Sequence, residues 1–224
     1  GASPDQIMLT DSGTQAIDLL CRFLIEPGDA VLVDDPCYFN FHALLRAHRA
    51  KVVGVPYTPA GPDIELFGRA LAEHRPRLYI TNSALHNPTG ASLSPVTAHR
   101  VLKLAEQSGL TIVEDDIFAD FEHEPAPRLA AFDGLDRVVH IGSFSKTLSA
   151  SVRCGFIAAR RDWIPVWWRS VQRLDPDACR IEFHLDFEFT NALIELAFGR
   201  IFKELAANMV QAFTVRAKEV YSAA

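Results

Sequence analysis

Hydrophobic positions along the first 160 residues alternate between short continuous runs and stretches with helical spacing. The continuous runs are typical of strands buried on both faces of a parallel sheet. They span 30–33, 52–55, 78–81, 110–113, 138–141 and 155–158. The stretches with helical spacing span 14–25, 39–48, 64–73 and 94–107. Repeated strand–helix–strand units predict an α/β fold, in which a mostly parallel sheet lies between two layers of helices.

The last third of the chain has a different pattern. Residues 162–174 have helical spacing, and 181–189 alternate strictly between apolar and polar side chains, which is the period of a half-buried strand. Helical spacing returns over 191–221. We therefore expect a core over 1–170, followed over 171–224 by a strand and a helix.

The composition narrows the class of protein. The 224 residues are 49% hydrophobic with a net charge of −6, which excludes wholesale disorder and disfavours direct nucleic-acid binding. No apolar run reaches the roughly 18 residues of a membrane span. The four cysteines form no C-x-x-C pair and the eight histidines no H-E-x-x-H motif, so we expect a cytoplasmic protein without a metal site. Because the chain opens on Gly1 rather than on methionine, we expect a piece of a longer protein.

Polar motifs follow several predicted strands, at the edge where parallel α/β sheets bind ligands. The most informative is Ser143-Phe144-Ser145-Lys146, which Arg153 follows seven residues after the lysine. This pattern suits a lysine that forms an imine with a phosphate-bearing aldehyde, while Ser143, Ser145 and Arg153 hold the phosphate. An isolated motif of this kind is also compatible with a surface lysine in a polar loop.

Three further motifs favour the first interpretation. Ser12-Gly13-Thr14-Gln15 opens a predicted helix, whose free amide groups form an anion site, although such strings also serve as ordinary caps. Asn87-Pro88-Thr89-Gly90 places an amide beside the site, or forms an ordinary turn. Val113-Glu114-Asp115-Asp116 ends a buried strand in carboxylates, which need a cation nearby.

In their order and spacing, these four motifs resemble the large domain of fold-type I pyridoxal phosphate (PLP) proteins, the aminotransferase class I/II group. The resemblance runs from about Gln6 to about Trp163. The strings around Asn87, Asp115 and Lys146 are most similar to regulators of the MocR/GntR type, which carry an aminotransferase-like domain behind a DNA-binding winged helix. The chain contains no winged helix, so we expect no direct nucleic-acid binding by it.

The resemblance implies a role for each motif residue. Lys146 is implied to bind the cofactor and shuttle the proton, and Asp115, or alternatively Asp116, to pair with the pyridine nitrogen. Asn87 is implied to donate to the phenolic oxygen, and Tyr38, or alternatively Phe39, to stack on the ring. The implied phosphate cradle consists of Gly13, Thr14, Gln15, Ser143, Ser145 and Arg153.

The chain also departs from the family pattern. Phe118 stands where the family usually has a tyrosine that donates to the phenolic oxygen, and phenylalanine cannot make that bond. Members of the family run to about 400 residues, so we expect a truncated domain without its small domain. Related proteins dimerise, so the resemblance also implies a homodimer. His86 either contacts substrate or is a satisfied loop histidine.

Three functions remain open from the sequence. The first is an aminotransferase that moves an amino group between an amino acid and a 2-oxo acid. The second is a PLP- or amino-acid-sensing effector domain of a MocR/GntR-type regulator. The third is a packed α/β core without a ligand, which is most plausible for a fragment.

Overall fold

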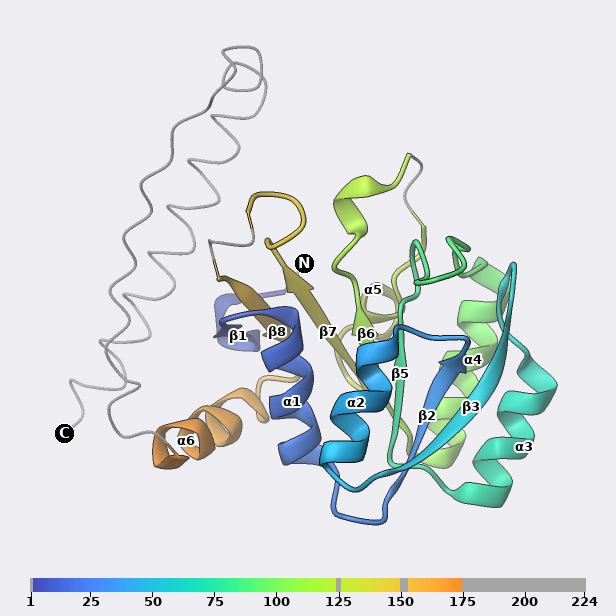
Figure 1. Ribbon diagram of the computed structural model, residues 1–224, viewed down its shortest axis with the longest axis horizontal. Coiled ribbons are helices and arrows are strands. Elements are labelled where there is room, and N and C mark those ends of the chain that lie inside the picture. Colours follow the sequence, from blue (N-terminus) through green and yellow to red (C-terminus); the bar gives the residue numbers. More distant parts are fainter. Residues whose placement is uncertain (1, 124–125, 150–152, 175–224) are drawn as a thin grey trace. The chain divides into compact units, whose positions relative to one another are not determined.

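The computed structural model describes residues 2–123, 126–149 and 153–174 (Figure 1). By its contacts the chain divides into Gly1–Trp167 and Trp168–Ala224, and the first unit carries the sheet and every motif discussed below. The predicted strand over 181–189 and helix over 191–221 lie outside the described residues. None of the described helices is long and apolar enough to cross a membrane.

Eight strands form one sheet in the order β1-β8-β7-β6-β5-β2-β3-β4. The strands are β1 (Ile7–Thr10), β2 (Ala30–Asp35), β3 (Lys51–Thr58), β4 (Gly61–Pro62), β5 (Leu78–Thr81), β6 (Thr111–Asp115), β7 (Val138–Ser143) and β8 (Gly155–Ala158). The helices are α1 (Gly13–Leu24), α2 (Phe39–Ala47), α3 (Ile64–His74), α4 (Pro95–Ser108), α5 (Leu129–Asp133) and α6 (Ile164–Leu174). Short 3-10 helices span Pro4–Gln6 and Ala119–Phe121.

The sheet is parallel from β3 through β2, β5 and β6 to β7, and antiparallel only where β4, β8 and β1 join. The predicted α/β fold with a mostly parallel sheet is therefore confirmed. The sequence missed β1, because a run of four residues that ends in Thr10 is too short to recognise without its partner β8.

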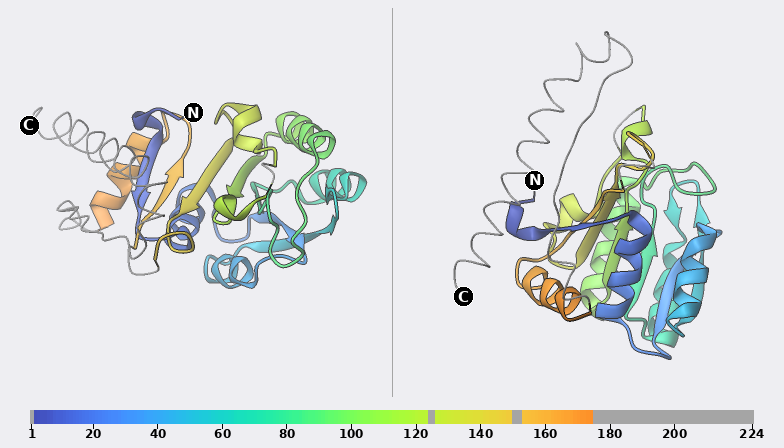
Figure 2. Two further views of the ribbon diagram at one scale, coloured as in Figure 1. Left: turned by 90° about the horizontal axis from the view of Figure 1, so that it is seen from above. Right: turned by 60° about the vertical axis from the view of Figure 1, so that its left-hand side comes forward.

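Helices cover both faces of the sheet (Figure 2). Leu32, Tyr79, Ile112 and Val138 lie in register across four strands and pack against α3, α4 and α5. Because side chains alternate along a strand, their neighbours in sequence point to the other face. On that face α1 packs against β7 and β8, and α2 lies beside it. We call the face that packs against α3, α4 and α5 the α4 face, and the opposite one the α1 face.

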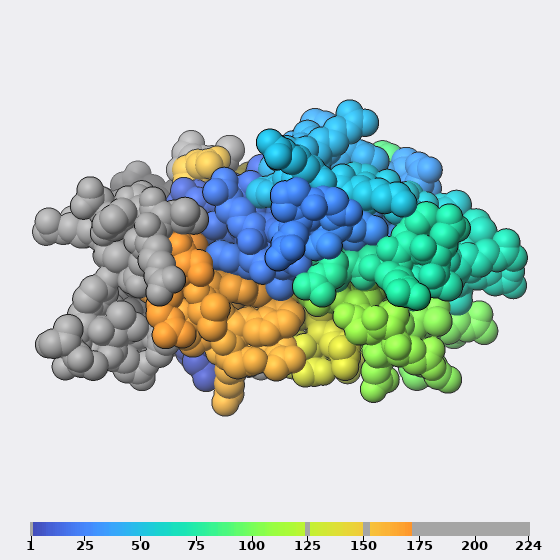
Figure 3. Space-filling view, turned by 90° about the horizontal axis from the view of Figure 1, so that it is seen from below, coloured from blue at the N-terminus to red at the C-terminus, as the bar shows by residue number. Residues whose placement is uncertain are grey.

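The strands begin at one end of the sheet, where turns hydrogen-bond to one another. Gly28 donates to the Arg49 carbonyl, Arg77 donates to Ala30, and Thr111 donates to Arg77. Figure 3 shows this end from below, with the blue, green and yellow-green segments directly beside one another. The connections that carry the polar motifs leave the sheet at the opposite end, where β2, β5, β6 and β7 finish.

Candidate functional site

The amino terminus of α1 lies against the ends of β6 and β7. A β-carbon built on Gly13 would lie 3.7 Å from Cβ of Ser143 and 3.8 Å from Cδ1 of Ile117. Asp115 pairs with Ile141 across β6 and β7, so its side chain points to the α1 face. Segments that are far apart in the sequence therefore bring Gly13, Ser143 and Asp115 to one edge of the sheet.

The first turn of α1 offers hydrogen-bond donors to an anion. Ser12 Oγ accepts from the Gln15 amide at 3.1 Å, so this donor is already used by the cap. The Gln15 side chain is also engaged, because its oxygen accepts from the Asp11 amide at 2.7 Å. Within the described part of the chain, the amide groups of Gly13 and Thr14 have no acceptor, and they remain open to a ligand.

The position of this helix terminus depends on Gly155 in β8. A β-carbon there would lie 2.7 Å from the carbonyl carbon of Ser12 and 3.0 Å from the Gly13 nitrogen. Both are backbone atoms, which cannot move aside as the end of a side chain can. Only glycine allows β8 to approach the start of α1 this closely.

Lys146 lies in an exposed turn that follows β7 directly. Ser143 is buried at the end of the strand, and its hydroxyl donates to Ser145 Oγ at 3.1 Å. Arg153 is exposed, at the end of the connection that returns to β8. Of these residues, Ser143 lies beside the start of α1, and Lys146 follows it in the same turn.

Asp115 is a buried carboxylate without a salt bridge to any described residue. Burial raises its pKa from 3.8 to about 6, and the Ile117 amide and the Asn82 side chain act in the opposite direction. The Ile117 amide donates to Asp115 Oδ1 at 3.2 Å. Asn82 donates to the Asp115 carbonyl at 3.0 Å, while its own side-chain oxygen is buried without a partner among the described residues.

The neighbouring carboxylates differ, because they already have partners. Asp116 Oδ2 accepts from Arg128 Nε at 2.6 Å, and Arg128 also contacts Glu122. Glu114 points to the α4 face, where it accepts from the amides of Leu129 and Ala130 at 2.7 and 2.9 Å. Of the three acidic side chains, Asp115 alone is left with a need for a positive partner.

The loops after β2 and β5 carry the remaining predicted residues. Tyr38 is half-buried and contacts Phe41 edge-on, with ring centroids 5.6 Å apart, whereas Phe39 is 74% exposed. Asn87 is half-buried, and the preceding His86 is fully buried. Of the two interpretations of His86, the structure supports the satisfied histidine, because both ring nitrogens have partners within the protein.

The donors at this edge fit a phosphorylated pyridine aldehyde. The amides of α1 and the hydroxyls after β7 suit the phosphate, and the Lys146 amine suits the aldehyde. Asp115 suits a protonated ring nitrogen, because it is a buried carboxylate to which no described residue supplies a cation. Phe118 is half-buried after β6, where it contributes no hydroxyl.

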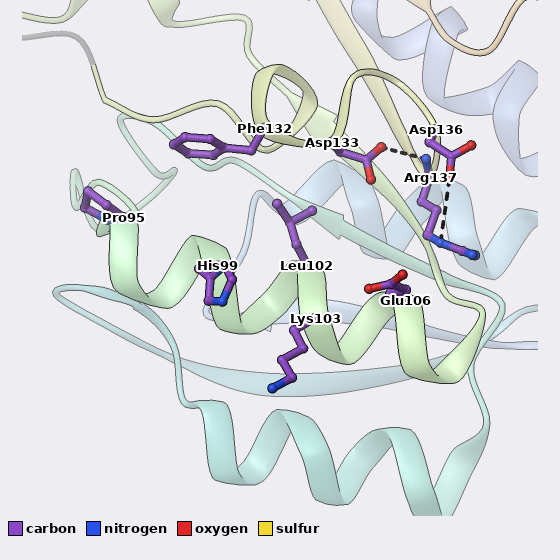
Figure 4. A pocket seen from close by; sticks show the side chains of 9 residues that line it. All are labelled: Pro95, His99, Leu102, Lys103, Glu106, Phe132, Asp133, Asp136 and Arg137. Carbon is purple, nitrogen blue, oxygen red and sulfur yellow. Dashed lines mark hydrogen bonds and ion pairs between the residues drawn. The ribbon is translucent and has the colours of Figure 1, made fainter.

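Sequence reasoning missed Asn82 and Arg128: Asn82 holds the Asp115 backbone, and Arg128 neutralises Asp116. Asn82 follows the last residue of β5, so the rule that ligands bind beyond strand ends would have found it. Arg128 carries no such signal. A hollow between α4 and the start of β7 (Figure 4) contains none of the predicted site residues. Its lining includes Phe132 and opposite charges such as Lys103 and Asp136.

One group of relatives matches only a short stretch of the chain. Over 50 residues the chain is 92% identical to the persistence and stress-resistance toxin PasT of Escherichia coli O6:H1, covering 22% of this chain and 32% of the toxin. A third of a protein is too little to transfer its activity.

Comparisons over most of the chain give a consistent result. It is 31% identical over 165 residues to the 2-aminoadipate transaminase of Thermus thermophilus, covering 71% of this chain and 41% of that protein. It is 33% identical over 177 residues to the HTH-type transcriptional regulator YdcR of Escherichia coli, covering 77% of this chain and 36% of YdcR. The chain thus spans less than half the length of these relatives.

Solved structures agree with the fold described above. The α-aminoadipate aminotransferase LysN of Thermus thermophilus, complexed with N-(5'-phosphopyridoxyl)-L-leucine, superposes with a TM-score of 0.74 at 26% identity, over 95% of this chain and 53% of LysN. The family model of aminotransferase class I and II matches residues 2–213. The chain therefore belongs to the aminotransferase class I and II family, with the fold-type I architecture of its PLP-dependent members.

Proposed function

We propose that the chain is the PLP-binding domain of an aminotransferase, which transfers an amino group between an amino acid and a 2-oxo acid. The observation that carries this proposal is Asp115, a buried carboxylate with no cation partner among the described residues, at the same edge as the open amides of α1 and the turn of Lys146. Bound PLP supplies an electron sink for the carbanion at the substrate Cα.

Each residue at this edge then has a task. The Lys146 amine binds the cofactor aldehyde and moves the proton at the substrate Cα, and the Asp115 carboxylate keeps a proton on the pyridine nitrogen. Asn87 donates to the phenolic oxygen, and Tyr38 stacks on the ring. The phosphate is bound by Gly13, Thr14, Gln15, Ser143, Ser145 and Arg153. The Gln15 amide exchanges its hydrogen bond to Ser12 Oγ for one to the phosphate.

A second candidate function is an effector domain of a MocR/GntR-type regulator. The similarity to YdcR favours it, and so does Phe118, which cannot donate to the phenolic oxygen as the tyrosine usual in the family would. Such a domain uses the same residues to bind PLP, without turnover. For either function we propose a homodimer in the cytoplasm.

We further propose that the PLP-binding core ends near residue 170 and that the stretch shared with the toxin follows it. The 165 residues matched by the transaminase and the 50 matched by the toxin fit into 224 without overlap. The family model itself continues to residue 213, beyond this division.

We expect both stretches to occur in one natural polypeptide. Trypsin that misses Arg173 and cleaves after Arg169 and Arg180 gives a peptide, Ser170–Arg180, that begins at the proposed end of the core and runs into the following stretch. Its detection in a digest of the native protein, by mass spectrometry, checks this expectation. Finding only peptides from either side, at comparable intensity, would contradict it.

Replacing Lys146 with alanine is expected to abolish covalent attachment of PLP, because no other described residue at this edge carries a side-chain amine. The measurement titrates the chain with PLP, reduces it with borohydride and determines the mass of the labelled peptide. Lys103→Ala is the matched control, because Lys103 is exposed on α4 and lines the hollow of Figure 4. Labelling of Lys146→Ala at the wild-type level would disprove the assignment, and an unlabelled wild type would disprove PLP binding by this chain.

The two candidate functions are separated by adding amino acids to the loaded protein. An aminotransferase releases one 2-oxo acid per bound cofactor. An effector domain binds the amino acid, shifts the visible absorbance and releases none.

A further inference from the structure

A buried polar cluster connects the ends of β2 and β5 on the α4 face of the sheet. Its centre is Asp34, which is 1% exposed. The carboxylate accepts hydrogen bonds from the Tyr79 hydroxyl, from Thr81 Oγ1 at 2.7 Å and from His86 Nε2 at 3.2 Å. Three donors from one neighbouring segment compensate for burying this carboxylate.

His86 is fixed by contacts on every side. Because Nε2 faces a carboxylate, it carries the proton and donates, so that Nδ1 accepts from Thr89 Oγ1 at 2.9 Å. The imidazole also stacks on Tyr57 of β3, with ring centroids 3.8 Å apart and 14° between the planes.

The backbone of His86 closes the loop that contains Asn87. The His86 amide donates to the Ala91 carbonyl at 2.8 Å, and the His86 carbonyl accepts from Gly90 at 2.6 Å. The loop therefore cannot change position without moving the histidine, whose ring is held by Asp34. Asp34 itself lies four residues before Tyr38, at the end of β2.

We propose that Asp34 and His86 are a positioning pair, which fixes the loops that present Asn87 and Tyr38 to the cofactor. This inference rests on the proposed function. The pair lies on the opposite face of the sheet from Asp115, so it acts through the two loops and does not touch the cofactor. The hydrogen bond between Asp34 and His86 ties the two loops to each other.

The test compares the pH midpoint of the visible band of bound PLP in three variants. A hydrogen bond from Asn87 to the phenolic oxygen favours the deprotonated cofactor and holds this midpoint low. His86→Gln and Asp34→Asn misplace Asn87, so we expect each to raise the midpoint by about 0.5 pH unit or more. This shift corresponds to about a threefold change in the proton equilibrium. Combining either with Asn87→Ala is expected to add little further shift.

Tyr79→Phe is the matched control, because it removes a different hydrogen bond from the same carboxylate. We expect it to lower the melting temperature and to leave the midpoint unchanged. A midpoint in His86→Gln and Asp34→Asn equal to that of Tyr79→Phe, or full additivity with Asn87→Ala, would overturn the proposal.

Hydrogen exchange of the cofactor-free chain gives an independent readout. The amides of His86 and Gly90 are expected to exchange about tenfold faster in Asp34→Asn than in wild type, and at the wild-type rate in Tyr79→Phe. If wild type binds no PLP, the proposed function fails, while exchange still decides whether Asp34 fixes the loop. Unchanged exchange in Asp34→Asn would refute the pair.

Discussion

Replacing Arg128 with methionine is expected to lower the free energy of unfolding by about 3–5 kcal/mol at pH 7, because it leaves buried carboxylates without their cation. The guanidinium contacts Asp116 and Glu122, whose side chains are 7% and 6% exposed, and it donates to the Ala126 carbonyl at 2.8 Å. Methionine keeps most of the packing volume and removes the charge. Urea unfolding measured by circular dichroism checks the value.

The pH dependence of this loss identifies its cause. Burial already raises the pKa of Asp116, and Arg128 opposes that rise. Without Arg128 the folded-state pKa rises further above the unfolded one, so the loss is greatest above the new value and shrinks toward pH 4 as the carboxyls bind protons. Arg137→Met is the control: Arg137 is more exposed and lies 3.9 Å from Asp136, so we expect a loss of less than about 1 kcal/mol. Equal losses in both variants would refute the account.

Asp115→Asn is expected to stabilise the cofactor-free chain and to impair the proposed amino transfer. A rise in pKa from 3.8 to about 6 means that the folded state binds the proton more tightly. Burying the charge therefore costs about 3 kcal/mol at pH values above 6, and this cost disappears as the pH falls to 4. The free energy of unfolding of wild type and variant is measured between pH 4 and 8. The difference between the two proteins should appear between pH 4 and 6.

Asp116→Asn is the matched control, since it makes the same chemical change one residue further along. Arg128 offsets part of the cost of burying the Asp116 carboxylate, so we expect a smaller gain in stability at pH 8 than in Asp115→Asn. Activity of the loaded protein should fall more in Asp115→Asn, because an amide does not keep the pyridine nitrogen protonated. Opposite results would transfer the ring-nitrogen role to Asp116.

The sequence predicted most of the fold, because hydrophobic periodicity is a local property. Leu78–Thr81 and Gly155–Ala158 have the bounds that their apolar runs predict, and the helix bounds differ by one or two residues. The short edge strand β1 was missed, because only its pairing with β8 distinguishes it from a loop. The five-residue α5 was missed for a similar reason, since its start is set by Glu114, far earlier in the chain.

The site was predictable as a set of motifs and not as a set of contacts. Residues that follow strands meet at one edge, so the position of Asn87, Asp115 and Lys146 followed from the order of elements. The partner of each side chain depends on packing between distant segments, and the sequence therefore left Asp115 and Asp116 as alternatives. In the structure Arg128 pairs with Asp116, which favours Asp115 for the proposed role, and no sequence motif indicates Arg128.

The alternation of β6 gives the site a parity rule. Glu114 and Asp115 point to opposite faces because they are consecutive, and the α1 face receives only every second residue. Inserting or deleting one residue within β6 would exchange the unneutralised carboxylate for one that the protein already satisfies, whereas a change of two would restore the pattern. The role of Asp115 thus depends on its position in the alternation of β6 as well as on its chemistry.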